Sequence, residues 1–515
     1  MSQFTPANAP LIGLDSAPVN KFNPNSVLSP SLSASRNTCV LLGDSITARC
    51  NTSISVAPAN VVGSAAGTTI TTSAQNVLDG RVNLSQSQNP ALDHSIVQAT
   101  NVDANVFTIP VPTSGNPPSS LVISIQTQLS ERGWFTWLNA LTGQRFNLLN
   151  NAAIGGETVA DIALRVDRDV IAYSPGICFI MAGINDCSAG TPAATTFSRL
   201  QAIYEKLIPY GIRPVLLTVL PLYTGHANFA TAMPLVQQLN QLIKNYAFNN
   251  NLLCIDAHAA IVDPASATGA ALVDTLDTDN IHPSAYGARL IGLAGAAMFT
   301  PQTQTPPGLT VSQVDNFGSS SSNWQLIDTA PWNASGGTVT GTNMSGTAPS
   351  GFTVQLTAGT VTSGVVSVPA RVAATDGDAI GNNVQVVITS SGTPTVQMFP
   401  ASIRLRLVAG GTYQLRVPVR LTNVAGSNLR GIQFQMQFAG VNGQSAIVRA
   451  WGNEATVALA TNYADGTYHM YSPVFTVPSW FTNTSGGFPI LQFAFSAAGT
   501  ALTVNAGRWT MQRLS

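Results

Sequence analysis

The sequence has little charge and almost no lysine. Only 9% of its 515 residues are charged, and the formal net charge is −1, whereas globular proteins average ~25% charged residues. Lysine occurs only as Lys21, Lys206 and Lys244. Ser, Thr, Asn, Gln and backbone amides must therefore form much of the surface, which suits β-rich extracellular or virion proteins and neutral glycan partners. The charge balance does not indicate nucleic-acid binding or attachment to an anionic membrane.

The sequence also lacks a cysteine framework. Its cysteines are odd in number, all lie in the first half of the chain, and their spacing fits neither a disulfide set nor a metal site. Those inside apolar runs are expected to be buried as small hydrophobic residues. The five cysteines are Cys39, Cys50, Cys178, Cys187 and Cys254, of which Cys178 and Cys254 lie in such runs.

No long hydrophobic segment is present. The sequence contains no run of about 18 apolar residues, so we expect no transmembrane helix. The first residues form a polar, Pro- and Asn-rich segment without the positive and apolar regions of a signal peptide, so none is expected.

The length is sufficient for two or three domains. Residues 1–35 contain five prolines among Ser and Asn, which indicates an extended arm; plain disorder and attachment to a larger assembly both remain open. Residues 36–300 are predicted to form an α/β domain. Residues 301–308 are a Pro- and Thr-rich linker, and residues 309–515 form a second domain.

The first domain alternates between apolar strands and amphipathic helices, which predicts a three-layer α/β/α fold with a parallel sheet. Strands are expected at 37–43, 146–150, 177–181, 213–220 and 252–256. Helices are expected at 134–142, 157–173, 195–210, 234–248 and from Pro283 to Met298, with Pro283 in the first helical position. Residues 51–130 interrupt this pattern with short β-like runs, so we predict a β-rich insertion that lies beside the active site.

The second domain switches to a period of two. Apolar residues alternate with Gln or Arg at 403–407, 413–421 and 432–438, as in strands with one buried face. With Gly, Ser and Asn between these segments, a β-sandwich of jelly-roll type is predicted. Trp509 is expected in the closing strand. By pattern alone, the domain is similar to carbohydrate-binding or phage-tail sandwiches.

Four short segments, each at the end of a predicted strand, carry the chemistry. They are Gly43-Asp44-Ser45-Ile46, the Gly155-Gly156-Glu157-Thr158 segment, Gly183-Ile184-Asn185-Asp186 and Asp279-Asn280-Ile281-His282. Together and in this order they resemble the SGNH (GDSL-like) hydrolase family. The resemblance covers about residues 36–300 and implies a serine esterase.

Ester hydrolysis requires a nucleophile, a base and donors for the oxyanion. Ser45 is the candidate nucleophile and His282 the base. Asp279 stands three residues before His282, so its carboxylate can reach the Nδ1–H group and orient the ring. These residues are the predicted catalytic triad.

The resemblance implies three oxyanion donors: the backbone N–H groups of Ser45 and Gly156 and the side-chain amide of Asn185. Gly156 is chosen over the adjacent Gly155 because it directly precedes the Glu157-Thr158 pair. Asp44 and Asp186 are interpreted as residues that organise the loops. No cofactor is expected. A metal is disfavoured because none of the other histidines has neighbours at metal-ligand spacing. These histidines are His94, His226, His258 and His469.

The preferred function is removal of O-acetyl groups from a polysaccharide such as a capsule or O-antigen. The protein resembles phage tail-associated SGNH deacetylases, which implies location on a virion tail or outside the cell and assembly as a homotrimer or as part of a virion tail. Two alternatives remain. One is a lipase or thioesterase acting on acyl chains, and the other is a receptor-binding tail module with a vestigial hydrolase.

Overall fold

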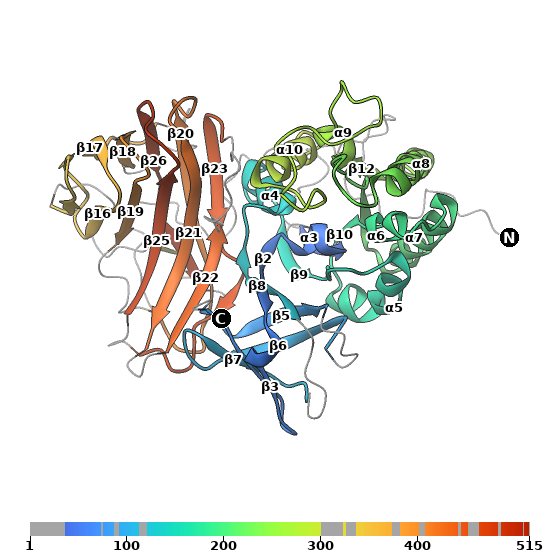
Figure 1. Cartoon of the computed structure of the whole chain (residues 1–515). Helices are drawn as coiled ribbons and strands as arrows, with labels where there is room; N and C mark the ends of the chain where they lie inside the picture. The colour runs from blue at the N-terminus through green and yellow to red at the C-terminus, as the bar shows by residue number, and fades with distance from the viewer. Residues whose placement is uncertain are drawn as a thin grey trace.

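The structure is a computed structural model that combines an α/β part, a β-rich insertion and a C-terminal β part (Figure 1). The residues it describes are 37–73, 76–86, 92–112, 121–299, 323–325, 336–372, 382–400, 407–440, 444–451, 463–482, 486–507 and 509–513. The predicted arm at 1–35 and the linker at 301–308 lie outside these residues, as does the predicted strand segment at 403–406.

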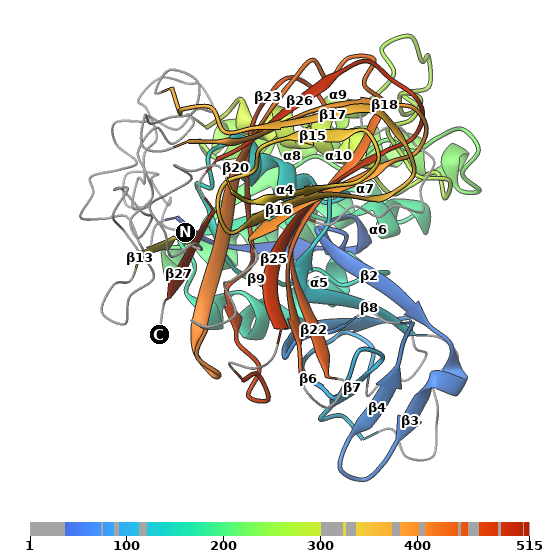
Figure 2. The same cartoon turned by 90° about the vertical axis from the view of Figure 1, so that its left-hand side faces the viewer.

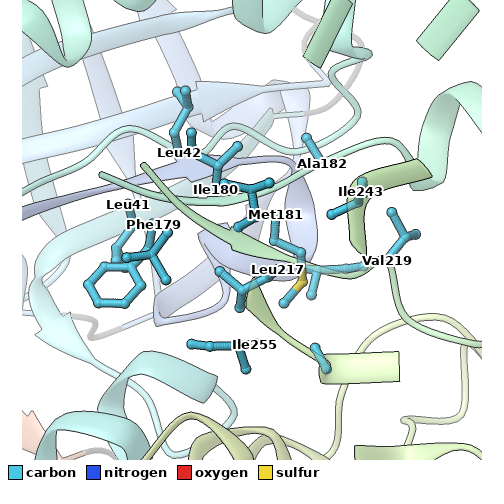
Figure 3. Packing of buried hydrophobic residues seen from close by; sticks show 14 of the residues in the cluster. Leu41, Leu42, Phe179, Ile180, Met181, Ala182, Leu217, Val219, Ile243 and Ile255 are labelled. Carbon is cyan, nitrogen blue, oxygen red and sulfur yellow. The ribbon is translucent and has the colours of Figure 1, made fainter. Parts of the chain in front are cut away.

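A five-stranded parallel sheet forms the centre of the α/β part, in the order β12-β11-β10-β1-β9. Its inner strands are continuous apolar runs because both faces of the sheet are covered. Leu41 on β1 lies opposite Phe179 on β10, and these side chains pack with Leu217 and Ile255 in one core (Figure 3). The strands are β1 Thr38–Gly43, β9 Asn147–Asn151, β10 Ile177–Met181, β11 Arg213–Leu217 and β12 Leu253–Ile255.

Helices lie on both sides of this sheet, as the sequence pattern predicts (Figure 1). On one side α10 packs against α4, and on the other α7 packs against α5 and α8. The longer helices are α4 Trp134–Leu141, α5 Val159–Asp169, α7 Ala193–Leu207, α8 Phe229–Asn249 and α10 Ala285–Ala296. Short helices follow three strand ends: α3 Ser45–Ala48, α6 Ile184–Ser188 and α9 Ala257–Ile261.

Four helix starts differ from the prediction. Helix α5 begins at Val159 rather than 157, after its cap residue Thr158, and α7 begins at Ala193 rather than 195. The other two differences lie near a proline inside or before the helix. Helix α8 begins at Phe229, five residues before Pro234, because Ala232 and Met233 are buried and anchor an extra turn. Pro234 costs that helix one backbone hydrogen bond but does not end it. Helix α10 begins at Ala285 rather than Pro283, because the Ser284 side chain accepts from Gly287 N–H at 3.1 Å and caps the helix.

The insertion is an antiparallel β structure that leaves the α/β part directly after α3 (Figure 2). Its long strand β8 pairs with β2 and β5, and the chain of pairs continues through β6, β7 and β4 to β3. The strands are β2 Asn51–Val56, β3 Val61–Gly63, β4 Thr68–Thr71, β5 Gly80–Ser85, β6 Ser95–Asn101, β7 Val106–Ile109 and β8 Leu121–Leu129.

The C-terminal part contains two sheets that share one hydrophobic core. One sheet holds β15 Met344–Gly346, β17 Val361–Ser367, β18 Val384–Ser390, β26 Leu502–Ala506, β20 Thr412–Thr422, β27 Thr510–Arg513 and β13 Asn323–Gln325, with β23 Gly466–Tyr471 and β24 Phe475–Thr476 also on β20. The other holds β14 Thr338–Thr340, β16 Phe352–Ala358, β19 Thr395–Pro400, β25 Gly486–Phe495, β21 Leu429–Ala439 and β22 Ser445–Trp451. This sheet continues into the insertion, because β22 pairs in parallel with β8. A β-rich C-terminal part is therefore present, whereas jelly-roll topology remains a prediction.

Apolar and polar residues alternate along these strands. Every second residue of β20 is buried, from Tyr413 to Leu421, and the residues between them are only partly exposed. Trp509 is fully buried and directly precedes β27. It contacts the rings of Phe352 and Phe434, which lie on the opposite sheet. The predicted period of two thus corresponds to one face in a shared core.

Helix α4 joins the two halves of the molecule. Trp134 packs in the α/β core, whereas Trp137 packs in the C-terminal core with its ring 4.7 Å from that of Trp451. Tyr463 donates a hydrogen bond of 2.9 Å to the Glu131 carboxylate just before α4. The C-terminal part is therefore attached through buried contacts.

Among the described helices, none is both long enough and apolar enough to cross a membrane.

Candidate active site

The four predicted segments meet at one edge of the parallel sheet. The Ser45 segment follows β1, the Gly156 segment follows β9 and the Asn185 segment follows β10. The Asp279–His282 segment precedes α10. The carboxyl ends of parallel strands lie at the same edge, which is where open α/β sheets place their binding sites.

Ser45 is the first residue of α3. The Asp44 side chain caps this helix by accepting from Ile46 N–H at 3.0 Å. The preceding Gly43 is required because a Cβ atom there would lie 2.2 Å from the Met181 carbonyl oxygen of β10. The chain therefore leaves the sheet abruptly and presents the Ser45 side chain at its edge.

Ser45, His282 and Asp279 form a continuous hydrogen-bonded chain. Ser45 Oγ lies 2.7 Å from His282 Nε2, and His282 Nδ1 lies 2.8 Å from Asp279 Oδ2. The other oxygen of Asp279 accepts from the backbone N–H of His282 at 3.0 Å. Asn280 permits this tight turn because it adopts a left-handed φ of 65°, which Asn tolerates better than most residues. The loop thus places carboxylate, imidazole and hydroxyl in the order needed for proton transfer.

The electrostatics favour a neutral imidazole beside an ionised carboxylate. Burial lowers the pKa of His282, and the charge of Arg49 lowers it further, against the raising effect of Asp279. Burial alone would raise the pKa of Asp279. The hydrogen bonds and charge of His282, with the charge of Arg49, outweigh burial and hold this pKa well below its usual range. At neutral pH His282 can therefore accept the Ser45 proton.

Arg49 is a part of the site that sequence reasoning missed. It lies at the end of α3 and pairs with Asp279 Oδ2 at 3.0 Å. It also pairs with Asp277, which Arg132 contacts at 3.1 Å. Asp277 N–H in turn donates to the His282 carbonyl at 2.8 Å. This cluster joins the helix of Ser45 to the loop of His282, across more than 200 residues of sequence, so no local motif could identify it.

The predicted oxyanion donors lie in the segments that follow β1, β9 and β10. In the described part of the chain, the N–H groups of Ser45 and Gly156 have no hydrogen-bond acceptor. The Asn185 side-chain amide donates to the Glu157 carbonyl at 2.8 Å, which orients it and leaves its second N–H. A Cβ atom at Gly155 would lie 3.7 Å from Ser45 Cβ. Gly155 therefore lies beside Ser45, whereas a Cβ atom at Gly156 would have no neighbour within 4 Å.

A buried ion pair supports the glycine segment. Glu157 is fully buried, and Arg165 Nε donates to both of its carboxylate oxygens at 2.9 and 2.8 Å. Arg165 also donates to the Ala152 carbonyl. Asp186 accepts from Val159 N–H at 2.8 Å, which agrees with the interpretation of Asp186 as a loop organiser. These contacts fix the segment that carries Gly156.

The insertion contacts the same segment, as expected from its position after Ser45. Asn83 on β5 donates to the carbonyl oxygens of Asn151 and Ala153 at 2.8 and 2.6 Å. Two residues further on, Ser85 Oγ would lie 3.2 Å from a Cβ atom at Gly155. The insertion is therefore part of the wall beside Ser45.

The remaining histidines and the cysteines have other surroundings. His94 contacts Glu157 at 2.9 Å, and burial lowers the pKa of His258. Burial, followed by the charges of Arg416 and Arg371, lowers the pKa of His469 to about 3. All five cysteines are free thiols; Cys178 is buried as predicted, whereas Cys254 is only partly buried. In the described ranges, no three His, Cys, Asp or Glu side chains form a metal-binding group.

The fold and this geometry together are typical of serine hydrolases. Residues 113–290 match the model of the GDSL-like Lipase/Acylhydrolase family, which supports placing the α/β part of the chain in that family. The matched range begins downstream of Ser45, so the case for this serine depends on its position in the structure.

Individual relatives cover parts of the chain. The uncharacterized lipoprotein YqeF of Bacillus subtilis is 28% identical over 184 residues, which are 30% of this chain and 75% of that protein. An acetylxylan esterase of Geobacillus stearothermophilus is 28% identical over 154 residues, or 28% of this chain and 68% of that protein. A solved structure of an acetylxylan esterase from the same organism has 17% identity and a TM-score of 0.30, covering 52% of this chain and 94% of the other.

Proposed function

We propose that the protein is a serine esterase that hydrolyses O-acetyl esters of a polysaccharide, with Ser45, His282 and Asp279 as its catalytic triad. The observation that carries this proposal is the hydrogen-bonded chain from Ser45 Oγ to His282 Nε2 and from His282 Nδ1 to Asp279, at 2.7 and 2.8 Å. A free serine hydroxyl is a weak nucleophile, and a neutral imidazole at this distance activates it.

In the first half of the reaction, Ser45 Oγ attacks the ester carbonyl carbon while His282 Nε2 takes the hydroxyl proton. The carbonyl oxygen becomes an oxyanion held by the N–H groups of Ser45 and Gly156 and by the amide of Asn185. When the tetrahedral intermediate collapses, the bond to the sugar oxygen breaks and His282 returns the proton to that oxygen. The sugar leaves with a free hydroxyl, and the acetyl group remains on Ser45.

In the second half, water replaces the sugar. His282 takes a proton from the water as its oxygen attacks the acetyl carbon, and the same donors hold the second oxyanion. The bond to Ser45 Oγ then breaks, His282 returns the proton to Ser45, and acetic acid leaves and releases its remaining proton to solvent. Asp279 keeps the ring in the required tautomer and stabilises the imidazolium in both halves.

Two observations support an acetylated glycan as substrate. A relative with 28% identity over 154 residues is an acetylxylan esterase. The surface is also poor in charge, with only three lysines in 515 residues, and neutral hydroxyl and amide groups suit neutral sugars. A lipase or thioesterase is the competing function, because the matched family includes lipases. A series of p-nitrophenyl esters separates them: we expect acetate to be preferred, and a preference for chains of eight or more carbons would favour the lipase.

We further propose that the protein acts outside the cell or on a virion tail, as a homotrimer. The location is supported by the composition and by a lipoprotein relative, YqeF. The homotrimer rests only on the resemblance to tail-associated deacetylases. Light scattering coupled to size-exclusion chromatography measures the oligomeric state. A mass near three times 53.6 kDa is expected, and a monomeric mass would reject the trimer.

The direct test is acetate release from acetylated polysaccharide and from p-nitrophenyl acetate by the Ser45→Ala variant. We expect both activities to fall by more than about 10⁴-fold, since removal of a triad serine eliminates nucleophilic catalysis. The matched control is Ser391→Ala, an exposed serine of the C-terminal part, which should retain full activity. Equal activity of the Ser45→Ala variant and the wild type would reject the proposal.

A further inference from the structure

A cavity of about 360 Å³ lies where the three parts of the chain meet. Its walls come from strands β5, β6 and β8 of the insertion, from the edge strand β9, and from the turn between β23 and β24. Small-molecule sites typically enclose ~300–1,000 Å³, so the cavity is large enough for a ligand of about one or two sugar units. None of the residues assigned to the catalytic triad lines it.

The lining is polar and mostly uncharged. Side-chain amides come from several of the neighbouring strands, including Gln98 on β6, Gln126 on β8 and Asn147 on β9. The Gln98 and Asn147 amides can offer donors and acceptors, the combination that sugar hydroxyls require. The Gln126 amide is already engaged, since its Nε2 donates to Asn83 Oδ1 at 2.7 Å and to the Asn151 carbonyl at 3.0 Å. The exposed Val474 of the β23–β24 turn adds an apolar surface on one side. The cavity therefore combines hydrogen-bonding groups with an apolar wall.

One charge of each sign completes the lining. Asp79 Oδ1 accepts from Asn101 N–H at 2.6 Å, and Arg81 donates to the Leu149 carbonyl at 2.7 Å. Arg81 also stacks on the Tyr173 ring at 4.8 Å. These contacts hold both charged groups in place, and each keeps hydrogen-bonding capacity beyond the contact named. Because the charges balance, the cavity suits a neutral ligand better than an anion.

The cavity is separate from the catalytic serine but connected to it through β5. Gly80 and Arg81 at the start of β5 line the cavity, whereas Ser85 at its end lies beside Gly155 and Ser45. Five residues of extended strand span roughly 17 Å. A group bound beside Gly80 and Arg81 is therefore too far away to be the ester that reacts at Ser45. The Asn151 wall is nearer to the active site, since its side chain donates to the Thr47 carbonyl of α3 at 3.2 Å.

We propose that this cavity is a non-catalytic binding site for a neutral sugar unit of the polysaccharide. The choice of a glycan rests on the proposed esterase function, while the site itself rests on the lining residues. Occupation of the cavity would retain a polymer on the enzyme between cleavage events. Hydrolysis of a small ester should not depend on the cavity.

Binding is tested with the full-length Ser45→Ala protein, so that catalysis does not alter the ligand. The probes are xylohexaose, cellohexaose, mannohexaose and chitohexaose, titrated calorimetrically up to about 10 mM, since single sugar sites often bind in the millimolar range. We expect at least one probe to bind, and the double variant Gln98→Ala/Asn147→Ala to weaken binding about tenfold or more. Both side chains are exposed, so the fold should persist.

Two further variants complete the test. Thr476→Trp places a large side chain at the cavity mouth and should block binding, whereas Gln241→Ala/Asn250→Ala removes two exposed amides on and next to α8 and should change nothing. Absence of binding by all four probes overturns the proposal, as does binding that survives both cavity variants. Hydrolysis of p-nitrophenyl acetate by the cavity variants with Ser45 intact should equal that of wild type. Because binding is measured without catalysis, failure of the esterase function would be seen separately, as no wild-type hydrolysis of p-nitrophenyl acetate.

Discussion

Arg49 provides the sharpest test of how the site is held together. Replacement by Met removes the guanidinium that contacts Asp279 at 3.0 Å and also pairs with Asp277. The Asp279 side chain is 38% exposed and that of Arg49 is 24% exposed, so solvent screens the pair. We therefore assign it about 1–2 kcal/mol, between an exposed ion pair and a buried charge-assisted hydrogen bond. Each 1.36 kcal/mol corresponds to a tenfold change in rate, so kcat/KM should fall about 5- to 30-fold.

The pH profile distinguishes this role from a merely structural one. The positive charge of Arg49 contributes to the lowered pKa of His282. Without that charge the pKa of His282 rises, so the acidic limb of kcat/KM should move to higher pH. Arg49→Lys keeps the charge, and its acidic limb should stay near that of wild type while the rate partly recovers. The assay is p-nitrophenyl acetate hydrolysis between pH 4 and 9, with circular dichroism to verify folding.

Arg132→Met is the matched control, because Arg132 pairs at 3.1 Å with the same oxygen of Asp277 that Arg49 contacts. Its acidic limb should shift less than that of Arg49→Met. If Arg49→Met keeps kcat/KM within twofold of wild type and an unchanged acidic limb, Arg49 does not position the triad.

Two further substitutions probe the oxyanion site and the buried acid beside it. Asn185→Ala should lower kcat by about 10²–10³ with little change in KM, as measured by initial rates, because it removes one donor to the oxyanion; an unchanged kcat would exclude this role. Burial raises the pKa of Asp44 from 3.8 to about 7, with the charges of Asp186 and Glu157 adding to it. The folded state thus retains this proton longer than the unfolded state, and the protein loses up to about 4 kcal/mol of unfolding free energy as pH rises from 4 to 8. Asp44→Asn should reduce that loss in urea unfolding at both pH values, and an unaltered pH dependence would contradict the assignment.

Much of the fold follows from local pattern. The apolar run at residues 177–181 predicts the bounds of β10, Ile177–Met181. The alternation along β20 predicts a strand with one buried face. Local pattern was misleading near prolines. Pro234 reads as a helix start, but buried residues on its N-terminal side extend α8 backwards to Phe229. Tertiary packing decided that boundary, and packing is not visible in a local window.

In the candidate site too, local pattern predicts some residues, whereas others are recognised only from tertiary contacts. Ser45, Asn185 and His282 lie in short segments with recognisable composition, and the structure brings these segments to one edge of the sheet. Arg49 and Asn83 have no such signal, because their partners lie elsewhere in the fold: Arg49 reaches Asp279 across 230 positions and Asn83 reaches Asn151 across 68. A residue type alone does not specify a distant partner. Groups that hold a site in place therefore become visible only in the folded chain.

Covalent labelling tests the central claim most directly. A fluorophosphonate reacts with a serine only where a base and an oxyanion site activate it. Peptide mass spectrometry after labelling of the full-length protein should find one modified serine, Ser45, and the His282→Ala variant should remain unlabelled. A label on another serine, or none on the folded wild type under conditions that label a known serine esterase, would contradict the account.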